Sequence, residues 1–349
     1  MWDESLAKLS LGPESQTLAI VCSGDHFAVL TATGLIVLYN STTFDIKQNL
    51  THGERVCAMS FSSCSNLLVT YGFRTTKVWS INTGQIMYQI RNPLGSRAFT
   101  IKFFAGDAEL VIGSNDRLIR VAQLAVANPV WSILHPTLLK DDVAWDRPVQ
   151  HVPWRIAFNT DASCVAVAYR GSPLCVWAMD PPELIRRCMR SQEYAGNSWT
   201  VVDQVIWHPK SEEVLGLYFG GHIFRWNPYD DTQQELKADA SILASSSDGR
   251  FFVTGDSCGT IKLYNYHHFV LIYQLSCENM IKDICFSPDS KRLYDLRGQF
   301  CNIWEPNALV RMDETSEQES EVGSEVASIP AGTVSEAFAE VRVQITAIA

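Results

Sequence analysis

The pentapeptide GDSCG at residues 255–259 matches the G-x-S-x-G pattern of a nucleophilic serine. That mechanism needs the serine, here Ser257, at a sharp turn between a strand and a helix. The residues that follow, TIKLYN, are β-branched and aromatic and predict a strand. We therefore interpret Ser257 as part of a turn between two strands, without a catalytic role.

Two pairs of polar neighbours have side chains that bind metals or transfer protons in other proteins. Asp141 and Asp142 lie within an insertion, and His267 and His268 shortly precede the segment VLIYQL. Neither pair has a third ligand nearby in the sequence, and solvated loop residues are the simpler interpretation. The ten cysteines show neither a C-x-x-C spacing nor a neighbouring histidine, so we predict reduced thiols. The sequence predicts no catalytic residue, cofactor or metal site.

Four arginines recur in predicted turns: Arg74, Arg117, Arg170 and Arg297. If these turns are equivalent in the fold, their guanidinium groups share one face and attract a carboxylate or phosphate by bidentate hydrogen bonds. Asp116 and Asp256 occupy the same class of turn and would weaken this field. Solvated turn charges are the alternative, so the anion-binding face is a hypothesis.

The insertion at residues 132–153 and the residue that follows it carry Trp145, Arg147 and Trp154. Insertions in repeat proteins form loops that often lie on the binding face, and aromatic and arginine residues commonly anchor interfaces. The alternative is that the tryptophans only pack the insertion onto the domain. We predict that these three residues contribute to partner binding.

A repeat of about 40 residues determines where these side chains lie. Short strand-like segments end near Tyr39, Trp79, Ala122, Trp177, Trp226, Tyr264 and Trp304. Each follows a turn cluster and an apolar run, and each unit is predicted to contain four short strands. One four-stranded sheet cannot bury both of its apolar faces, whereas seven sheets packed radially can. The sequence therefore predicts an all-β fold, a seven-bladed β-propeller over residues 17–312, with the large rings filling the wedges between blades.

These units resemble the WD-repeat family, whose fold is a β-propeller. The family's Gly-His pair is largely missing, and its Asp after Trp is replaced by Ser80, Ala178, Asn227 or Glu305. The hydrogen-bond network that such residues form is therefore not expected here.

Segments 165–188, 205–228 and 292–311 also resemble the first propeller of large fungal NACHT–WD-repeat proteins. In that family a nucleotide-driven switch domain precedes repeats that act as a recognition or autoinhibitory half. The chain has no G-x-x-x-x-G-K-[ST] phosphate loop, so ATP binding does not carry over. The resemblance implies the repeat half alone, with an upstream NACHT domain and a second propeller as partners.

The termini differ in character from the repeats. Leu6 and Leu9 stand at helical spacing, so residues 1–16 are expected to form a short helix and linker. Residues 313–335 form an acidic segment expected to be a disordered linker. The tail at 336–349 contains VRVQITAIA, which resembles the opening strand of a second propeller.

Charge and hydropathy exclude some functions. The net charge is 28 − 38 = −10, and without a basic block the chain is a poor nucleic-acid binder. No apolar run approaches the ~18 residues of a membrane helix and no secretory signal is present, so a cytoplasmic protein without membrane partners is expected.

The function expected from the sequence is that of a non-catalytic protein-interaction scaffold or recognition module. The alternative is a propeller enzyme, a hydrolase or lyase, whose acids, histidines or metal ligands would converge on the central channel. A purely structural scaffold without a ligand is a third possibility.

Overall fold

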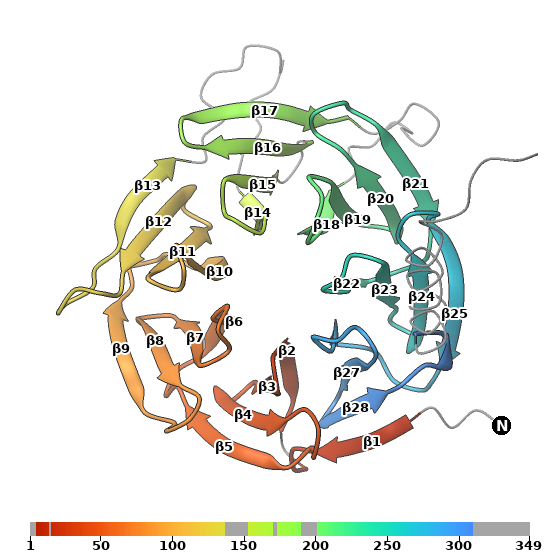
Figure 1. Ribbon diagram of the computed structural model, residues 1–349, viewed down its shortest axis with the longest axis horizontal. Coiled ribbons are helices and arrows are strands. Elements are labelled where there is room, and N and C mark those ends of the chain that lie inside the picture. Colours follow the sequence, from red (N-terminus) through yellow and green to blue (C-terminus); the bar gives the residue numbers. More distant parts are fainter. Residues whose placement is uncertain (1–4, 14, 137–152, 170–172, 190–200, 310–349) are drawn as a thin grey trace, which may run out of the picture. The chain divides into compact units, whose positions relative to one another are not determined.

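The protein is described by a computed structural model covering residues 5–13, 15–136, 153–169, 173–189 and 201–309. Within these ranges, strands β1 to β28 form seven four-stranded antiparallel sheets. The sheets surround a common axis as blades (Figure 1). The predicted all-β, seven-bladed propeller is confirmed.

The strands of each blade follow one another along the chain in all blades but the last. Blade 1 is β2 (Thr17–Ser23), β3 (His26–Thr31), β4 (Leu35–Asn40) and β5 (Ile46–Thr51), and blade 2 is β6 (Val56–Phe61), β7 (Leu67–Gly72), β8 (Thr75–Ser80) and β9 (Ile86–Arg91). Blade 3 is β10 (Ala98–Phe104), β11 (Glu109–Ser114), β12 (Leu118–Gln123) and β13 (Ser132–Pro136), and blade 4 is β14 (Pro153–Phe158), β15 (Cys164–Tyr169), β16 (Leu174–Met179) and β17 (Pro182–Cys188). Blade 5 is β18 (Val202–Trp207), β19 (Val214–Tyr218), β20 (His222–Trp226) and β21 (Gln233–Lys237), and blade 6 is β22 (Ile242–Ser245), β23 (Phe251–Gly255), β24 (Thr260–Asn265) and β25 (Val270–Ser276). Blade 7 is β26 (Asp283–Phe286), β27 (Leu293–Arg297), β28 (Phe300–Trp304) and β1 (Ser5–Ser10).

The first strand of each blade lies nearest the axis and the fourth lies at the rim (Figure 1). Because the strands alternate in direction, the turn between second and third strands and the loop leading to the next blade emerge on the same side. We call this side the upper face. The remaining turns form the lower face.

The seven predicted anchor positions all lie on third strands, at or near their ends. The anchors pack between blades: Trp79 of blade 2 shares a buried cluster with Leu38 of blade 1, and Trp226 of blade 5 shares one with Val176 of blade 4. These large rings are therefore buried against the preceding blade, as the repeat in the sequence predicts.

The prediction of an N-terminal helix is wrong. Residues 5–10 form strand β1, which pairs antiparallel with β28 and completes blade 7. Ala7, Leu9 and Leu11 alternate and pack against the cluster between blades 7 and 1, while Leu6 is 46% exposed. The two-residue period thus prevails over the helical spacing of Leu6 and Leu9, because β28 would otherwise present an open edge. The propeller consequently begins before residue 17.

Hydrogen bonds between turns link neighbouring blades on the lower face. The Asp107 carboxylate of blade 3 accepts the backbone N–H groups of Ser63 (2.8 Å) and Cys64 (3.0 Å) in blade 2. Burial raises the pKa of Asp107, but these hydrogen bonds outweigh it and lower the pKa overall. Similar bonds join Thr160 to Pro209, His208 to Gly249 and Ser247 to Pro288.

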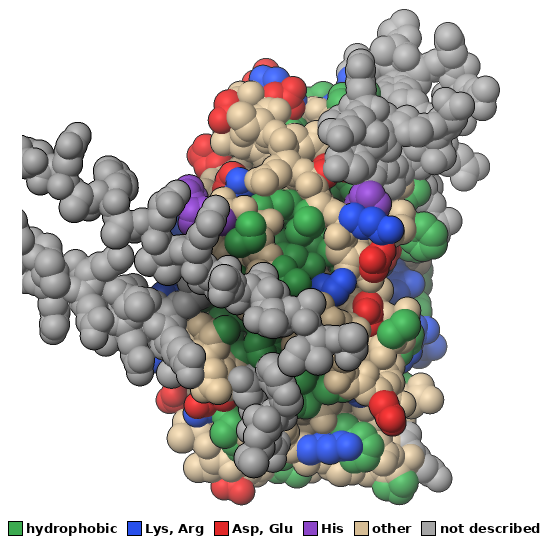
Figure 2. Space-filling model, turned by 90° about the vertical axis from the view of Figure 1, so that its right-hand side faces the viewer, with side chains coloured by type: hydrophobic (Ala, Val, Ile, Leu, Met, Phe, Trp, Pro, Cys, Tyr) green, Lys and Arg blue, Asp and Glu red, His purple; other side chains and the backbone are tan. Residues whose placement is uncertain are grey.

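The outer strands leave sheet edges at the rim. The pairing of third with outer strands shifts register at Leu38/Tyr39, Val78/Trp79, Val176/Trp177 and Leu263/Tyr264. Such bulges twist an edge away from pairing with another chain. Figure 2 shows one side of the propeller, where exposed hydrophobic side chains lie among scattered charged ones.

The propeller ends at Leu309, the last residue that the structure describes. The predicted acidic linker at 313–335 and the predicted tail strand at 336–349 lie outside the described residues. Within the described ranges, no helix has the length and hydropathy that crossing a membrane requires.

Candidate functional site

Four arginines occupy matching positions on the upper face of blades 2 and 3. Arg55 and Arg97 immediately precede the inner strands β6 and β10, and Arg74 and Arg117 immediately precede the third strands β8 and β12. Arg55, Arg74 and Arg97 are exposed and Arg117 is partly exposed. Among the described residues, no carboxylate lies within ion-pair distance of any of the four.

Hydrogen bonds join the loop and turns that carry three of these arginines. The N–H of Asn92 donates to the carbonyl of Arg74 (2.7 Å), which ties the loop between blades 2 and 3 to the turn of blade 2. Arg97 and Asn115 are joined by two hydrogen bonds, one to the Asn115 side chain (2.7 Å) and one from its N–H (3.0 Å). Arg97 therefore lies beside the turn that carries Arg117.

The acidic residues of this region, Glu54 and Asp116, are both hydrogen-bonded within the protein. Glu54 accepts hydrogen bonds from the N–H groups of Arg74 (3.0 Å) and Thr75 (2.9 Å) and from the Thr75 hydroxyl (2.7 Å). Burial raises the pKa of Glu54, but these hydrogen bonds outweigh it and lower the pKa overall. Asp116 forms a bidentate pair with buried Arg120 (2.6 and 3.0 Å), so the expected cancellation of the Arg117 charge is weakened.

Exposed apolar side chains accompany the arginines. Phe73, next to Arg74, is 52% exposed, and Leu94, in the loop leading to Arg97, is 94% exposed. Arginine beside exposed aromatic and aliphatic groups is a composition typical of protein interfaces. We call the set Arg55, Arg74, Arg97, Arg117, Phe73 and Leu94 the arginine face.

A buried hydrogen-bond chain supports the arginine face from below. Trp79 Nε1 donates to Thr70 Oγ1 (2.9 Å), and the same hydroxyl bonds His52 Nδ1 (2.8 Å). Burial lowers the pKa of His52, so its ring is neutral at pH 7. His52 lies in the loop that carries Glu54 and Arg55, so this network fixes the loop. Such a network was not expected from the sequence, in which the Gly-His pair is largely missing and this histidine precedes Gly53.

Arg297 does not join the arginine face. Its side chain is 5% exposed and forms a bidentate pair with Asp295 (3.0 and 2.9 Å). Asp295 also accepts from Asn302 (2.7 Å) and from Trp304 Nε1 (2.9 Å). The guanidinium of Arg297 therefore stabilises blade 7 internally, in contrast to the exposed position that its turn suggested.

The other predicted binding residues are only partly described. Trp154 lies near the start of β14, where its Nε1 donates to Asp203 (3.2 Å) and its ring lies 4.8 Å from the Arg155 guanidinium. Arg155 also pairs with Asp203 (3.3 Å). Arg170, Trp145 and Arg147 lie outside the described residues. The role of these residues in partner binding stays a prediction.

Arg55 and Arg97 were not identified from the sequence. Both precede the first strand of a unit, at matching positions of successive repeats. A repeat alignment extended one residue upstream of each first strand would have found them.

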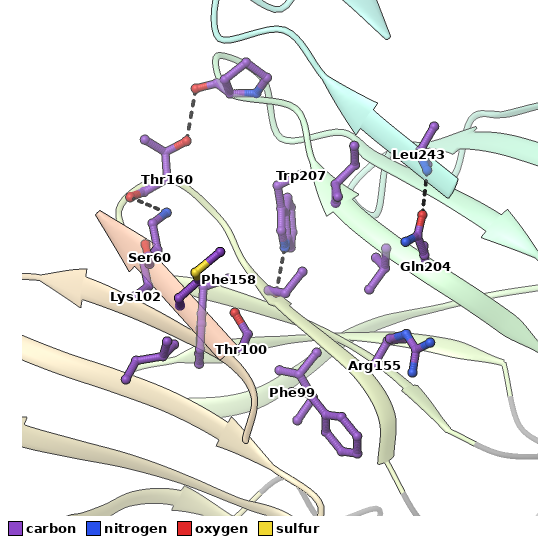
Figure 3. A pocket seen from close by; sticks show the side chains of 17 residues that line it. Ser60, Phe99, Thr100, Lys102, Arg155, Phe158, Thr160, Gln204, Trp207 and Leu243 are labelled. Carbon is purple, nitrogen blue, oxygen red and sulfur yellow. Dashed lines mark hydrogen bonds between the residues drawn. The ribbon is translucent and has the colours of Figure 1, made fainter. Parts of the chain in front are cut away.

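The central channel offers a cavity of about 620 Å³ lined by the inner strands of blades 2 to 6 (Figure 3). Lys102 donates to the carbonyls of Asn159 (2.7 Å) and Thr160 (3.1 Å), and burial lowers its pKa. Arg155, on the next blade, is paired with Asp203. Both basic groups are thus bound to the protein itself.

The predicted chemical candidates show no catalytic arrangement where they are described. Ser257 lies in a turn between strands β23 and β24, and the predicted strand after it is confirmed. Within the described ranges, no three His, Cys, Asp or Glu side chains gather as a metal site. Asp141 and Asp142 lie outside those ranges.

Comparisons with known proteins agree with this architecture. The family model for the WD domain, G-beta repeat, matches residues 234–265, which span β21 to β24. A crystal structure of the β-propeller domain of Cps50 (Swd1) from Myceliophteria thermophila is similar, with a TM-score of 0.70 and 12% identity over 86% of this chain and 99% of that chain. No curated protein sequence matches the chain.

The fold defines the class as a seven-bladed β-propeller, and the WD-repeat model matches one stretch of it, in blades 5 and 6. The similarity to the solved propeller shows the fold alone. Neither finding bears on the resemblance to NACHT–WD-repeat proteins.

Proposed function

We propose that this propeller is a non-catalytic protein-interaction module that binds an acidic, partly apolar segment of a partner on its arginine face. The observation that carries the proposal is the repeated placement of four arginines, none paired with a described carboxylate, on the turns and loops that also carry exposed Phe73 and Leu94. Arginine forks bind carboxylates bidentately, while the apolar groups gain from losing contact with water.

The rigid scaffold favours such binding. The arginine-bearing loops are held by backbone hydrogen bonds and by the His52–Thr70–Trp79 chain, so little conformational entropy is lost on association. An enzymatic function has no comparable support. Burial lowers the pKa of two basic groups in the channel, Lys102 and Arg155. Both are held by partners within the protein and do not form a nucleophile–base pair.

The proposal is tested with a labelled peptide of alternating Glu and Phe residues, and a matched peptide with Gln in place of Glu. Arg55→Ala/Arg97→Ala is expected to weaken binding of the Glu peptide roughly 10-fold or more, because two charge-assisted contacts are lost. Fluorescence anisotropy at several salt concentrations measures the affinity.

The control variant Lys47→Ala/Lys210→Ala also removes two exposed charges, both near lower-face turns. It should bind the Glu peptide like the wild type. Equal affinity of the Arg variant and the wild type, or equal affinity for the Gln peptide, would refute the acidic-segment proposal.

We further propose that the module serves as the sensor or autoinhibitory repeat half of a fungal NACHT-type signalling protein. This rests on the resemblance of segments 165–188, 205–228 and 292–311. Ligand binding would then shift a resting-to-active equilibrium through different affinities for the two states. A phosphate-loop domain encoded upstream in the same reading frame is the expected observation.

A further inference from the structure

Cys22 and Cys285 face each other at the joint between blades 1 and 7. Cys22 lies on β2 and Cys285 on β26, the inner strands of these blades. Their Sγ atoms are 2.9 Å apart, and both side chains pack against the same buried cluster between the two blades. They are thus adjacent in space although they are 263 positions apart in the sequence.

A second contact fixes the relative position of the two strands. The N–H of Ile20 donates to Asp283 Oδ2 at 2.8 Å. Ile20 and Asp283 each precede the respective cysteine by two residues, so both pairs lie on matching faces of their strands. The gap between the sulfurs exceeds the ~2.05 Å of a disulfide by only about 0.9 Å.

We propose that Cys22 and Cys285 form a modification site, a reversible disulfide that covalently closes the propeller ring at its inner edge. The oxidant is a low-molecular-weight disulfide such as glutathione disulfide. One protein thiol loses its proton and attacks a sulfur of the oxidant, which gives a mixed disulfide and releases one small thiol. The second protein thiol then displaces the other small thiol. The two cysteines together lose two protons and two electrons, and the electrons reduce the oxidant to two thiols.

A small oxidant can reach the pair, because Cys22 and Cys285 are both partly exposed. The thiol that is not attacked first already lies within contact distance of the other and completes the exchange. Burial and the hydrogen bond to Cys22 raise the pKa of Cys285, which slows its own first attack at neutral pH.

The disulfide would add a second closure to the ring. In the reduced protein, blade 7 is completed at the rim by the hydrogen bonds between β1 and β28. A covalent bond at the inner edge would tie blade 1 directly to blade 7 and restrict the unfolded chain by a very long loop. This consequence is independent of any ligand on the arginine face.

The test incubates the folded protein with glutathione disulfide and maps linked peptides by mass spectrometry. The wild type should yield a Cys22–Cys285 cross-linked peptide, and its melting temperature should rise by roughly 5–10 °C. Dithiothreitol should reverse both changes. Cys22→Ser should show neither.

The control variant Cys64→Ser/Cys258→Ser lacks the two exposed cysteines and should behave like the wild type. Glutathione attached to Cys64 and Cys258 without any Cys22–Cys285 link in the wild type would overturn the proposal. A link that leaves the melting temperature unchanged would overturn its role in closing the ring. The peptide map of the wild type decides the first point even if a cysteine variant fails to fold.

Discussion

Thr70 shows how one hydroxyl satisfies two buried groups. Its Oγ1 bonds both His52 Nδ1 and Trp79 Nε1, which come from different parts of blade 2 and its entry loop. All three side chains are buried. An unsatisfied buried polar group costs about 1–3 kcal/mol, so the network depends strongly on this one oxygen.

The first prediction concerns this hydroxyl. Thr70→Val keeps the side-chain shape but leaves two buried nitrogens without their shared partner. We expect the free energy of unfolding to fall by roughly 2–4 kcal/mol, measured by urea denaturation. Thr100→Val on β10, which borders the channel cavity, is the matched control and should change it by less than about 0.5 kcal/mol. Similar losses in both variants would contradict a special role of Thr70.

At the scale of elements, β1 is the strand that closes the ring. Its inward residues Ala7 and Leu9 pack against the cluster between blades 7 and 1, and its backbone pairs with β28. Blade 7 would otherwise contain three strands with an open edge.

The second prediction compares two leucines of this strand. Leu9→Asp places a charge against the buried cluster and should lower the free energy of unfolding by roughly 2–4 kcal/mol. It should also speed hydrogen exchange in residues Phe300–Trp304. Leu6→Asp, on the exposed side, should alter stability by less than about 1 kcal/mol. Equal effects of the two substitutions would show that β1 does not bury Leu9.

The third strands were predictable because their aromatic anchors recur with the repeat and pack between successive blades. Strand β1 was not, because its partner β28 lies near the other end of the chain and the short segment mimics helical spacing. Arg74 and Arg117 followed from their turns, whereas the burial of Arg297 depends on Asp295, a partner that sequence spacing alone does not reveal. Features that recur with the repeat could be predicted from the sequence. The positions of β1 and Arg297 could not, because each depends on a particular partner in the folded protein.

At the scale of the whole molecule, the joint between blades 1 and 7 carries a titratable group. Asp283 accepts the N–H groups of Ile20 (2.8 Å) and Ile284 (3.0 Å). Burial nevertheless raises the pKa of Asp283 to about 6. A carboxyl whose pKa is higher in the folded state contributes stability below its unfolded value, near 3.9, and this contribution is lost as the pH rises through about 6.

The third prediction follows from this loss of stability with rising pH. Between pH 4 and pH 7 the wild type should lose roughly 1–3 kcal/mol of unfolding free energy relative to Asp283→Asn, which still accepts a hydrogen bond but does not titrate. Chemical denaturation across this pH range measures the difference in unfolding free energy between the two proteins. The contributions of all other carboxylates cancel in this difference, because both proteins contain them. Parallel pH curves would show that Asp283 is not perturbed by folding.

The pairing of β1 with β28 has a consequence for synthesis. Strand β1 finds its neighbour β28 only after blades 1 to 6 have been translated. These blades can meanwhile assemble in the order of their emergence, but β1 stays unpaired until β28 has been made. A newly made propeller is therefore most vulnerable to aggregation just before blade 7 is released from the ribosome.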